Sequence, residues 1–480
     1  MGLREKALSG FLWTSAGTIG NGLLSIIVTI ILARLLTPSD FALVELLVVF
    51  VAVSNVIVDS GFSQAIIRDD APTDKGLSSV FWTNLVLSII LYVVLFFCAP
   101  LIASYFHAES LILYGRITFL VIIFNAFSVI QNAILNRQLD FANLNKASVL
   151  GAFIAGIIAV IMAFAGFGIW ALIANMVLMP LFRSLLLWIS SNWKPMIAFR
   201  VEDVKRYFTF GGFLMLDGII DTITMNLTSL MIGRHYTKNE LGYYSQGKKL
   251  DSMVVTPTTA VIKKVSYPIL SKIRKDENEL KRGYVEIISV IAFVFIPLSL
   301  FVIMTSDNMI VSLFGSQWAP SGVFLALFAF GSMFYPLQET CINIILVKGK
   351  SRQYFIMSVI RQIFRLTAII SFVHTSVLHL TIAYISANVI GALIYICYGF
   401  KEIKFSVIEI LKIFLPVIIS AIIAALSAKI LGNMVMFDNI IIVFVVQIII
   451  MLMVYFIMAR ILRIQTASVL TGTIRGMLHK

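Results

Sequence analysis

Eight basic side chains lie inside apolar stretches of this sequence that are long enough to cross a lipid bilayer. They are Arg116, Arg183, Lys248, Lys249, Lys263, Lys264, Arg361 and Arg365. A positive charge at membrane depth is costly, and it is retained mainly where it faces a water-filled cavity or a partner. The pattern therefore predicts a membrane-protein interior that holds an anion.

Arg361 and Arg365 lie nine and thirteen residues beyond Arg352, which is expected at the cytoplasmic surface. A helix rises about 1.5 Å per residue, so both lie too deep to reach the headgroups easily. Their spacing of four places them on one helix face, where like charges repel unless water or an anion lies opposite. Paired guanidinium groups suit a diphosphate. Pairing with a carboxylate of another helix is the alternative.

The other basic residues each allow more than one interpretation. Arg116 and Arg183 lie about seven residues from a helix end, so their partner is either a lipid headgroup or a substrate. Lys248 and Lys249 lie in a polar patch, where Lys248 either pairs with Asp251 or contacts substrate. The remaining two lysines lie near the inner end of their span, and we expect them to contact lipid phosphates.

Acidic residues also occur at membrane depth. They are Asp59, Asp217, Asp221 and Glu339. Asp217 and Asp221 are four residues apart on one face, which favours protonation of one of them and predicts coupling to H⁺ or Na⁺. Acting as counter-ions for Arg361 and Arg365 is the equally favoured alternative.

The other two acids have weaker contexts. Glu339 follows Pro336, and the backbone carbonyl that a proline frees could join the carboxylate around a cation. Asp59 precedes Gly61 near the inner end of its span and could simply hold helix packing.

The composition predicts an all-α integral membrane protein. Hydrophobic residues make up 60% of the 480, and the mean hydropathy is +0.98. Fourteen helical spans are expected, at 8–33, 41–67, 78–105, 109–134, 147–165, 168–190, 207–233, 241–271, 283–304, 320–347, 353–373, 378–400, 406–428 and 439–459. The polar intervals between them are too short for a soluble catalytic domain. Three cysteines without paired spacing predict neither a disulfide nor a metal site.

Charge placement supports this count and orients the chain. With a cytoplasmic N-terminus, the inner side carries 25 of the 37 Lys and Arg residues and the outer side carries four. The four outer residues are Arg34, Arg234, Lys238 and Lys429. This asymmetry follows the positive-inside rule and places both termini in the cytoplasm. The net charge of +13 is thus an orientation signal, which removes the reason to expect a nucleic-acid partner.

The sequence also contains a repeat. Residues 32–42 and 232–242 share an Arg, a Thr, an acid and a small residue at the same spacing, and residues 174–177 weakly match 387–390. Six spans separate the main copies, so the repeat is parallel, as in transporters with a site between two halves. We expect an N-terminal six-helix bundle at 1–190, a basic cytoplasmic linker at 191–206, a C-terminal six-helix bundle at 207–400, and two further helices with a cytoplasmic tail at 401–480.

Five runs of the sequence are typical of one transporter family. They are Ala33–Pro38, Asp59–Arg68, Ile232–Arg234, Leu241–Tyr244 and Tyr267–Ser271. In these runs the chain resembles the Wzx-type polysaccharide flippases of the multidrug/oligosaccharidyl-lipid/polysaccharide exporter superfamily. The resemblance implies a flippase that moves undecaprenyl-diphosphate-linked oligosaccharide from the cytoplasmic to the outer face of the inner membrane. Thr228 stands where many relatives carry an acid, which puts ion coupling at that point in doubt.

We therefore predict alternating access by two halves around a diphosphate-binding interior, in polysaccharide, lipopolysaccharide or O-antigen biosynthesis. No cofactor is expected, and a polymerase and a chain-length regulator are possible protein partners. A lipid II flippase would need the same cations. A multidrug exporter of cationic drugs would need an acidic or neutral cavity, and is disfavoured. A membrane glycan polymerase or ligase would need a long outer loop with catalytic residues, so an enzyme is not expected.

Overall fold

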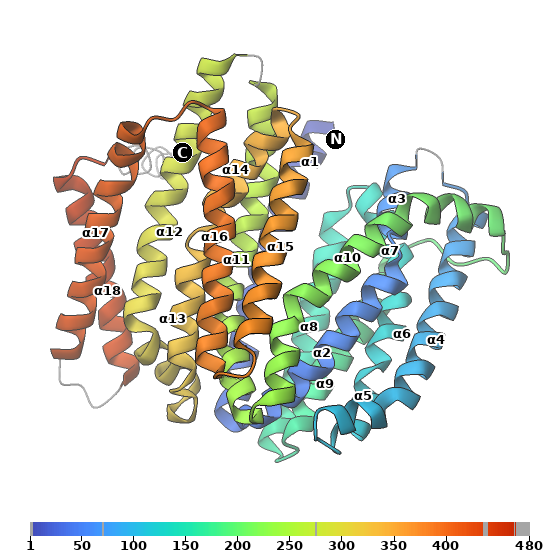
Figure 1. The fold of residues 1–480 in the computed structure, drawn as a ribbon. Helices are drawn as coiled ribbons and strands as arrows, with labels where there is room; N and C mark the ends of the chain where they lie inside the picture. The colour runs from blue at the N-terminus through green and yellow to red at the C-terminus, as the bar shows by residue number, and fades with distance from the viewer. Residues whose placement is uncertain (1–2, 70–71, 274–275, 435–439, 465, 467–480) are drawn as a thin grey trace. The chain divides into compact units, whose positions relative to one another are not determined.

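The computed structural model describes residues 3–69, 72–273, 276–434, 440–464 and 466, whose regular structure is helical without strands (Figure 1). The side chains of Lys263 and Lys264 lie outside the described residues, so their expected lipid contact stays a prediction. The chain divides into two compact units, Met1–Gly242 and Tyr243–Lys480.

The helices of the first unit follow each other with short connections. They are α1 (Leu3–Leu35), α2 (Pro38–Asp59), α3 (Phe62–Arg68), α4 (Asp74–Tyr105), α5 (Leu111–Thr118), α6 (Leu120–Ala126), α7 (Val129–Arg137), α8 (Phe141–Phe164), α9 (Ile169–Ser190) and α10 (Val201–His235). Helix α11 (Lys238–Lys272) begins in the first unit and continues in the second. The second unit continues with α12 (Glu277–Phe314), the short 3₁₀ helix η1 (Ser316–Trp318), α13 (Ser321–Ser332), α14 (Tyr335–Val347), α15 (Ser351–Phe372), α16 (Val377–Glu402), α17 (Val407–Met434) and α18 (Ile440–Ile461).

Twelve helical segments among the described residues are long and apolar enough to cross a membrane. The other two expected spans coincide with α10 and α11, each 35 residues long. The all-α membrane fold is therefore confirmed. The count of fourteen crossings is compatible with the helices and stays a prediction.

Three expected spans are interrupted rather than continuous. Span 41–67 breaks between α2 and α3, where Ser60 and Gly61 have φ angles of 45° and 68°. Span 109–134 is divided into α5, α6 and α7. Span 320–347 breaks between α13 and α14, just before Pro336, whose ring cannot continue a helix from the preceding turn.

The sequence repeat forms the same local structure twice. Thr37 caps α2 in a capping box, in which Asp40 Oδ2 accepts from the Thr37 N–H at 3.0 Å. In the second copy, Glu240 Oε2 accepts from the Thr237 N–H at 3.0 Å, and the Glu240 N–H donates to Thr237 Oγ1 at 3.3 Å. The shared Thr-x-x-acid spacing therefore starts α2 and α11 alike.

Helix α10 packs within the first unit, on α2, α3 and α4. At its start, Arg206 forms a 3.0 Å ion pair with Asp69, and the Tyr207 hydroxyl donates to the same carboxylate at 2.7 Å. The connection before it lies along α4, where the Arg200 N–H donates to Ser79 Oγ at 2.9 Å. The boundary between the two compact units thus lies after the end of α10, at Gly242. The expected division into two six-helix bundles stays a prediction.

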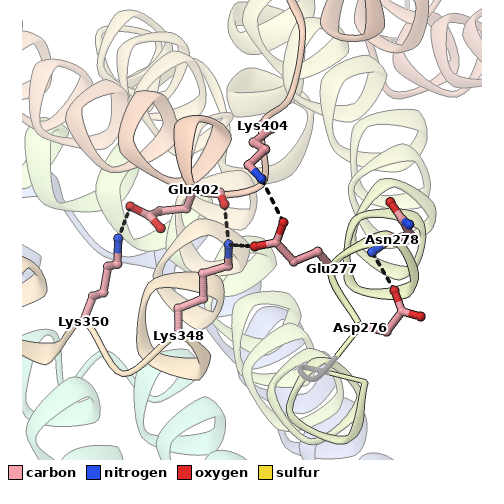
Figure 2. Close-up of polar contacts among 7 residues, drawn as sticks. All are labelled: Asp276, Glu277, Asn278, Lys348, Lys350, Glu402 and Lys404. Carbon is pink, nitrogen blue, oxygen red and sulfur yellow. Dashed lines mark hydrogen bonds and ion pairs between the residues drawn. The ribbon is translucent and has the colours of Figure 1, made fainter.

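In the second unit, α17 and α18 pack against α12 through an apolar cluster with small residues, including Ala421 and Ala425 of α17. At the N-terminal end of α12, charged residues connect this helix to the ends of α14, α15 and α16 (Figure 2). Lys350 forms a 2.6 Å ion pair with Glu402 of α16, which raises the pKa of the lysine. Lys404 pairs with Glu277 of α12 at 2.9 Å. These pairs hold the expected cytoplasmic ends of the helices together.

Candidate functional site

Arg361 and Arg365 lie on the protein-facing side of α15. Arg365 is 4% exposed and shares its face with the buried Met357 and Ile369. The opposite face carries exposed apolar residues such as Ile363. The two arginines therefore share one face of α15, and their role in binding an anion stays a prediction.

Arg365 is held by amide groups. Its Nη2 and Nε donate to Asn388 Oδ1 of α16 at 2.8 and 3.2 Å, and Nη1 donates to Gln362 Oε1 at 3.3 Å. The Asn388 NH₂ group donates to the Tyr384 carbonyl at 2.9 Å, which fixes the amide with its oxygen toward the guanidinium. These acceptors are neutral, so they orient Arg365 without cancelling its charge.

Arg361 lies one turn before Arg365 and is half-buried. Its guanidinium carbon is 5.7 Å from the ring centroid of Tyr395, a cation–π distance. A Cβ atom at position 391 would lie 2.6 Å from Arg361 Cγ, so Gly391 is what lets the side chain lie along α16. Its Nε is buried and has no hydrogen-bond partner within the described residues. Arg361 therefore keeps donor capacity that an anion could use.

The two arginines of the first unit also contact neutral groups. Arg116 Nε donates to the Phe96 carbonyl at 3.4 Å, and its guanidinium carbon lies 4.2 Å from the Phe96 ring centroid. Arg183 Nη2 donates to Asn132 Oδ1 at 2.9 Å. Both side chains are half-buried, and the choice between headgroup and substrate contact stays open for both.

The polar patch of α11 also contacts α13. Asp251 accepts a 2.7 Å hydrogen bond from the Ser332 hydroxyl. Lys248 is half-buried and Lys249 is exposed. Substrate contact by these lysines and local pairing of Lys248 both stay predictions.

Of the expected coupling acids, Asp217 and Asp221 are exposed on one face of α10, and Glu339 is half-buried on α14. Their role in ion coupling, and the alternative of pairing with the α15 arginines, stay predictions. Sequence reasoning missed Glu45 of α2, which accepts a 3.3 Å hydrogen bond from Ser229 of α10. Its signal in the sequence was a single acid inside a long apolar run.

A cavity of about 830 Å³ lies at the break between α2 and α3, and Asn55, Asp59, Gln64 and Arg68 contribute to its polar lining. Asp59 accepts from the Ser63 hydroxyl at 2.5 Å, so it also stabilises the start of α3. A Cβ atom at Gly61 would lie 2.5 Å from the Gly211 carbonyl oxygen of α10. Asp59 thus combines a packing role with access to a cavity.

Asn388 and Gln362 are further residues that sequence reasoning missed at the arginine pair. Asn388 belongs to the segment 387–390 that weakly matches 174–177. That match was the available signal, but it does not say that the asparagine contacts Arg365.

The chain resembles characterised proteins along most of its length. A family model described as "Polysaccharide biosynthesis protein" matches residues 31–323. Teichuronic acid biosynthesis protein TuaB of Bacillus subtilis (strain 168) is 24% identical over 351 residues, which is 73% of each chain. Lipopolysaccharide biosynthesis protein WzxC of Escherichia coli (strain K12) is 25% identical over 66% of this chain and 65% of its own.

Solved structures share the fold. The lipid II flippase MurJ, in an inward closed conformation, aligns with a TM-score of 0.73 and 19% identity over 94% of this chain and 98% of its own. An inward-facing multidrug resistance MATE family transporter of the MOP superfamily aligns with a TM-score of 0.62 and 16% identity, covering 80% and 94%. The resemblance to Wzx-type exporters is confirmed, and the family match spans more than half of the sequence. The chain belongs to this family of polysaccharide biosynthesis proteins.

Proposed function

We propose that this protein is a flippase that moves undecaprenyl-diphosphate-linked oligosaccharide from the cytoplasmic to the outer face of the inner membrane. The observation that carries the proposal is the arginine pair of α15, in which Arg365 is buried and bonded to neutral amide oxygens. Membership of the polysaccharide biosynthesis family gives the substrate class.

The physical task is to offset the desolvation of a diphosphate. Moving a doubly charged group out of water costs many kcal/mol unless it is paired and hydrogen-bonded. Arg361 and Arg365 could bind the diphosphate through forked N–H donors, with Arg116, Arg183, Lys248 and Lys249 as further contacts along its route. Alternating access would then expose the headgroup outside while the polyprenyl tail stays in lipid.

Transport of this kind forms and breaks no covalent bond, and we assign the protein no catalytic residue or cofactor. We propose that movement is driven by an H⁺ or Na⁺ gradient acting on Asp217 and Asp221, with Glu339 and Asp59 as further candidates. Consumption of the product outside would also drive it forward. A polymerase and a chain-length regulator are the proposed protein partners, and we propose that both chain ends lie in the cytoplasm.

A lipid II flippase is the second candidate, because the MurJ structure shares the fold over 94% of this chain. Its substrate carries the same diphosphate, so the arginine pair does not separate the two. A multidrug exporter would have to accept cations beside Arg365, whose hydrogen bonds in the described part of the chain go to neutral amide oxygens, and this disfavours it.

The test is transport by the purified full-length chain in proteoliposomes. Undecaprenyl-diphosphate oligosaccharide and lipid II, each with a fluorescent sugar, are compared by the loss of signal to a membrane-impermeant quencher added outside. We expect faster exposure of the oligosaccharide than in protein-free vesicles, and faster than for lipid II. Exposure of lipid II alone would replace the proposal by the second candidate, and exposure of neither would refute both.

A further inference from the structure

A second polar cavity, of about 460 Å³, lies where the two repeat copies begin their second helices. Its lining includes Ser39, His107, Arg234, Tyr236, Lys238 and Asn239. These residues come from the start of α2, the turn after α4, the end of α10 and the start of α11, all within the first unit. The volume lies within the range of small-ligand pockets, about 300–1,000 Å³.

The charge of this cavity is unusual for its side of the protein. Only four Lys and Arg residues are expected on the outer face, and two of them, Arg234 and Lys238, line this one cavity. The two nearby acids of the repeat turns, Asp40 and Glu240, are engaged in capping boxes. The cavity therefore gathers half of the basic side chains expected on this face, beside two carboxylates whose oxygens accept hydrogen bonds from Thr37 and Thr237.

Arg234 is held in place by its neighbours. Its Nη1 donates to the Tyr105 carbonyl and contacts Nε2 of His107, and its guanidinium carbon lies 4.8 Å from the Tyr105 ring centroid. Among the described residues, both hydrogen bonds of Arg234 use Nη1, so the Nη2 and Nε donors of the fork are available to a ligand.

We propose that this cavity binds a phosphate-bearing group at the outer face of the membrane. An oriented guanidinium fork and a lysine ammonium are the side chains that bind phosphate oxygens best. Ser39, Tyr236 and Asn239, which carry hydroxyl and amide groups, also line the cavity. That the cavity binds phosphate is inferred from its own residues. That it is an exit site for the diphosphate of the carrier lipid rests in addition on the proposed function.

The experiment measures binding without transport. The purified full-length protein is treated with an amine-reactive reagent, with and without inorganic pyrophosphate, and the labelling rate of each lysine is read by peptide mass spectrometry. Lys429 is the matched control, since it is expected on the same face but is not part of the cavity lining. We expect pyrophosphate to slow labelling of Lys238 and to leave Lys429 unchanged.

The Arg234→Gln variant should raise the pyrophosphate concentration for half-protection of Lys238 roughly tenfold or more, the loss of one charge-assisted contact. If that variant does not purify, Arg234→Lys keeps the charge, removes the fork and should also weaken protection. Labelling of Lys238 that ignores pyrophosphate, or equal protection of Lys429, would overturn the site. Protection of Lys238 by pyrophosphate without lipid transport would refute the proposed function and support the phosphate site. Lipid transport without protection of Lys238 would support the proposed function and refute the site.

Discussion

Replacing Asn388 separates two roles of Arg365 that a simple arginine deletion would confound. If Arg365 only holds α15 against α16, a carboxylate in place of Asn388 should be tolerated, because a buried ion pair would hold the helices at least as well. If its positive charge faces the substrate, a carboxylate at position 388 cancels what the substrate needs. If the charge faces the substrate, Asn388→Asp should therefore be the more stable of the two variants, and Asn388→Ala should be the better transporter.

The magnitudes follow from the geometry. The side-chain oxygen of Asn388 lies 2.8 Å from Arg365 Nη2, so an aspartate there would pair directly with the guanidinium. At an effective dielectric constant of about 20, two unit charges about 4 Å apart interact by roughly 4 kcal/mol. The carboxylate of Asn388→Asp would therefore oppose the attraction of Arg365 for an anionic substrate by about this amount. About 1.4 kcal/mol corresponds to a factor of ten, so Asn388→Asp should lower transport by roughly two to three powers of ten.

Asn388→Ala acts mainly on stability. It removes the acceptor of two hydrogen bonds to a buried charged group, which costs roughly 1.5–3 kcal/mol of unfolding free energy. The charge remains, so transport should fall less than in Asn388→Asp. Transport is measured in proteoliposomes and stability by thermal unfolding in detergent, with Asn278→Asp as an exposed control for the added charge. If Asn388→Asp transports as well as Asn388→Ala, the substrate-facing charge is refuted.

The remaining predictions test the other assignments. Replacing both α15 arginines with Ala should abolish surface glycan while the protein still inserts in the membrane, and normal glycan would reject their role. Asp217→Asn or Asp221→Asn should change the pH dependence of transport in vesicles, whereas an unchanged profile would remove the coupling hypothesis. Gly61→Ala should lower the unfolding free energy by about 2 kcal/mol or more, because φ is 68° and the Gly211 carbonyl is close. Gly166→Ala is its control, with φ of 82° and open space around it, and an equal loss in both would exclude the close approach as a cause.

Much of the fold could be predicted because its signals are local. Apolar runs of about 20 residues require helices in a bilayer, where every backbone group must be satisfied within the segment. The Thr-x-x-acid spacing predicted related turns in the two repeat copies, and Thr37 and Thr237 form equivalent hydrogen bonds. Such patterns depend only on residues a few positions apart.

The interruptions and contacts could not be predicted because they depend on distant residues. Ser60 adopts a positive φ, which a serine rarely does, beside a glycine that meets Gly211 about 150 positions away. The partner of Arg365 lies 23 residues along, on another helix. Glu45 was overlooked because a lone acid has no spacing pattern, and only the fold brings it to Ser229.

The neutral partner of Arg365 connects the fold to the proposed transport mechanism. A carboxylate would stabilise the buried guanidinium more strongly, but it would also compete with every phosphate that approaches. An amide supplies two hydrogen bonds and leaves the net charge in place. The Tyr384 carbonyl fixes that amide in turn, so the guanidinium is oriented before any substrate arrives. A flippase must bind its headgroup transiently on both sides of the membrane, and an arginine that is oriented by neutral amides can bind an anion in one state and release it in the next.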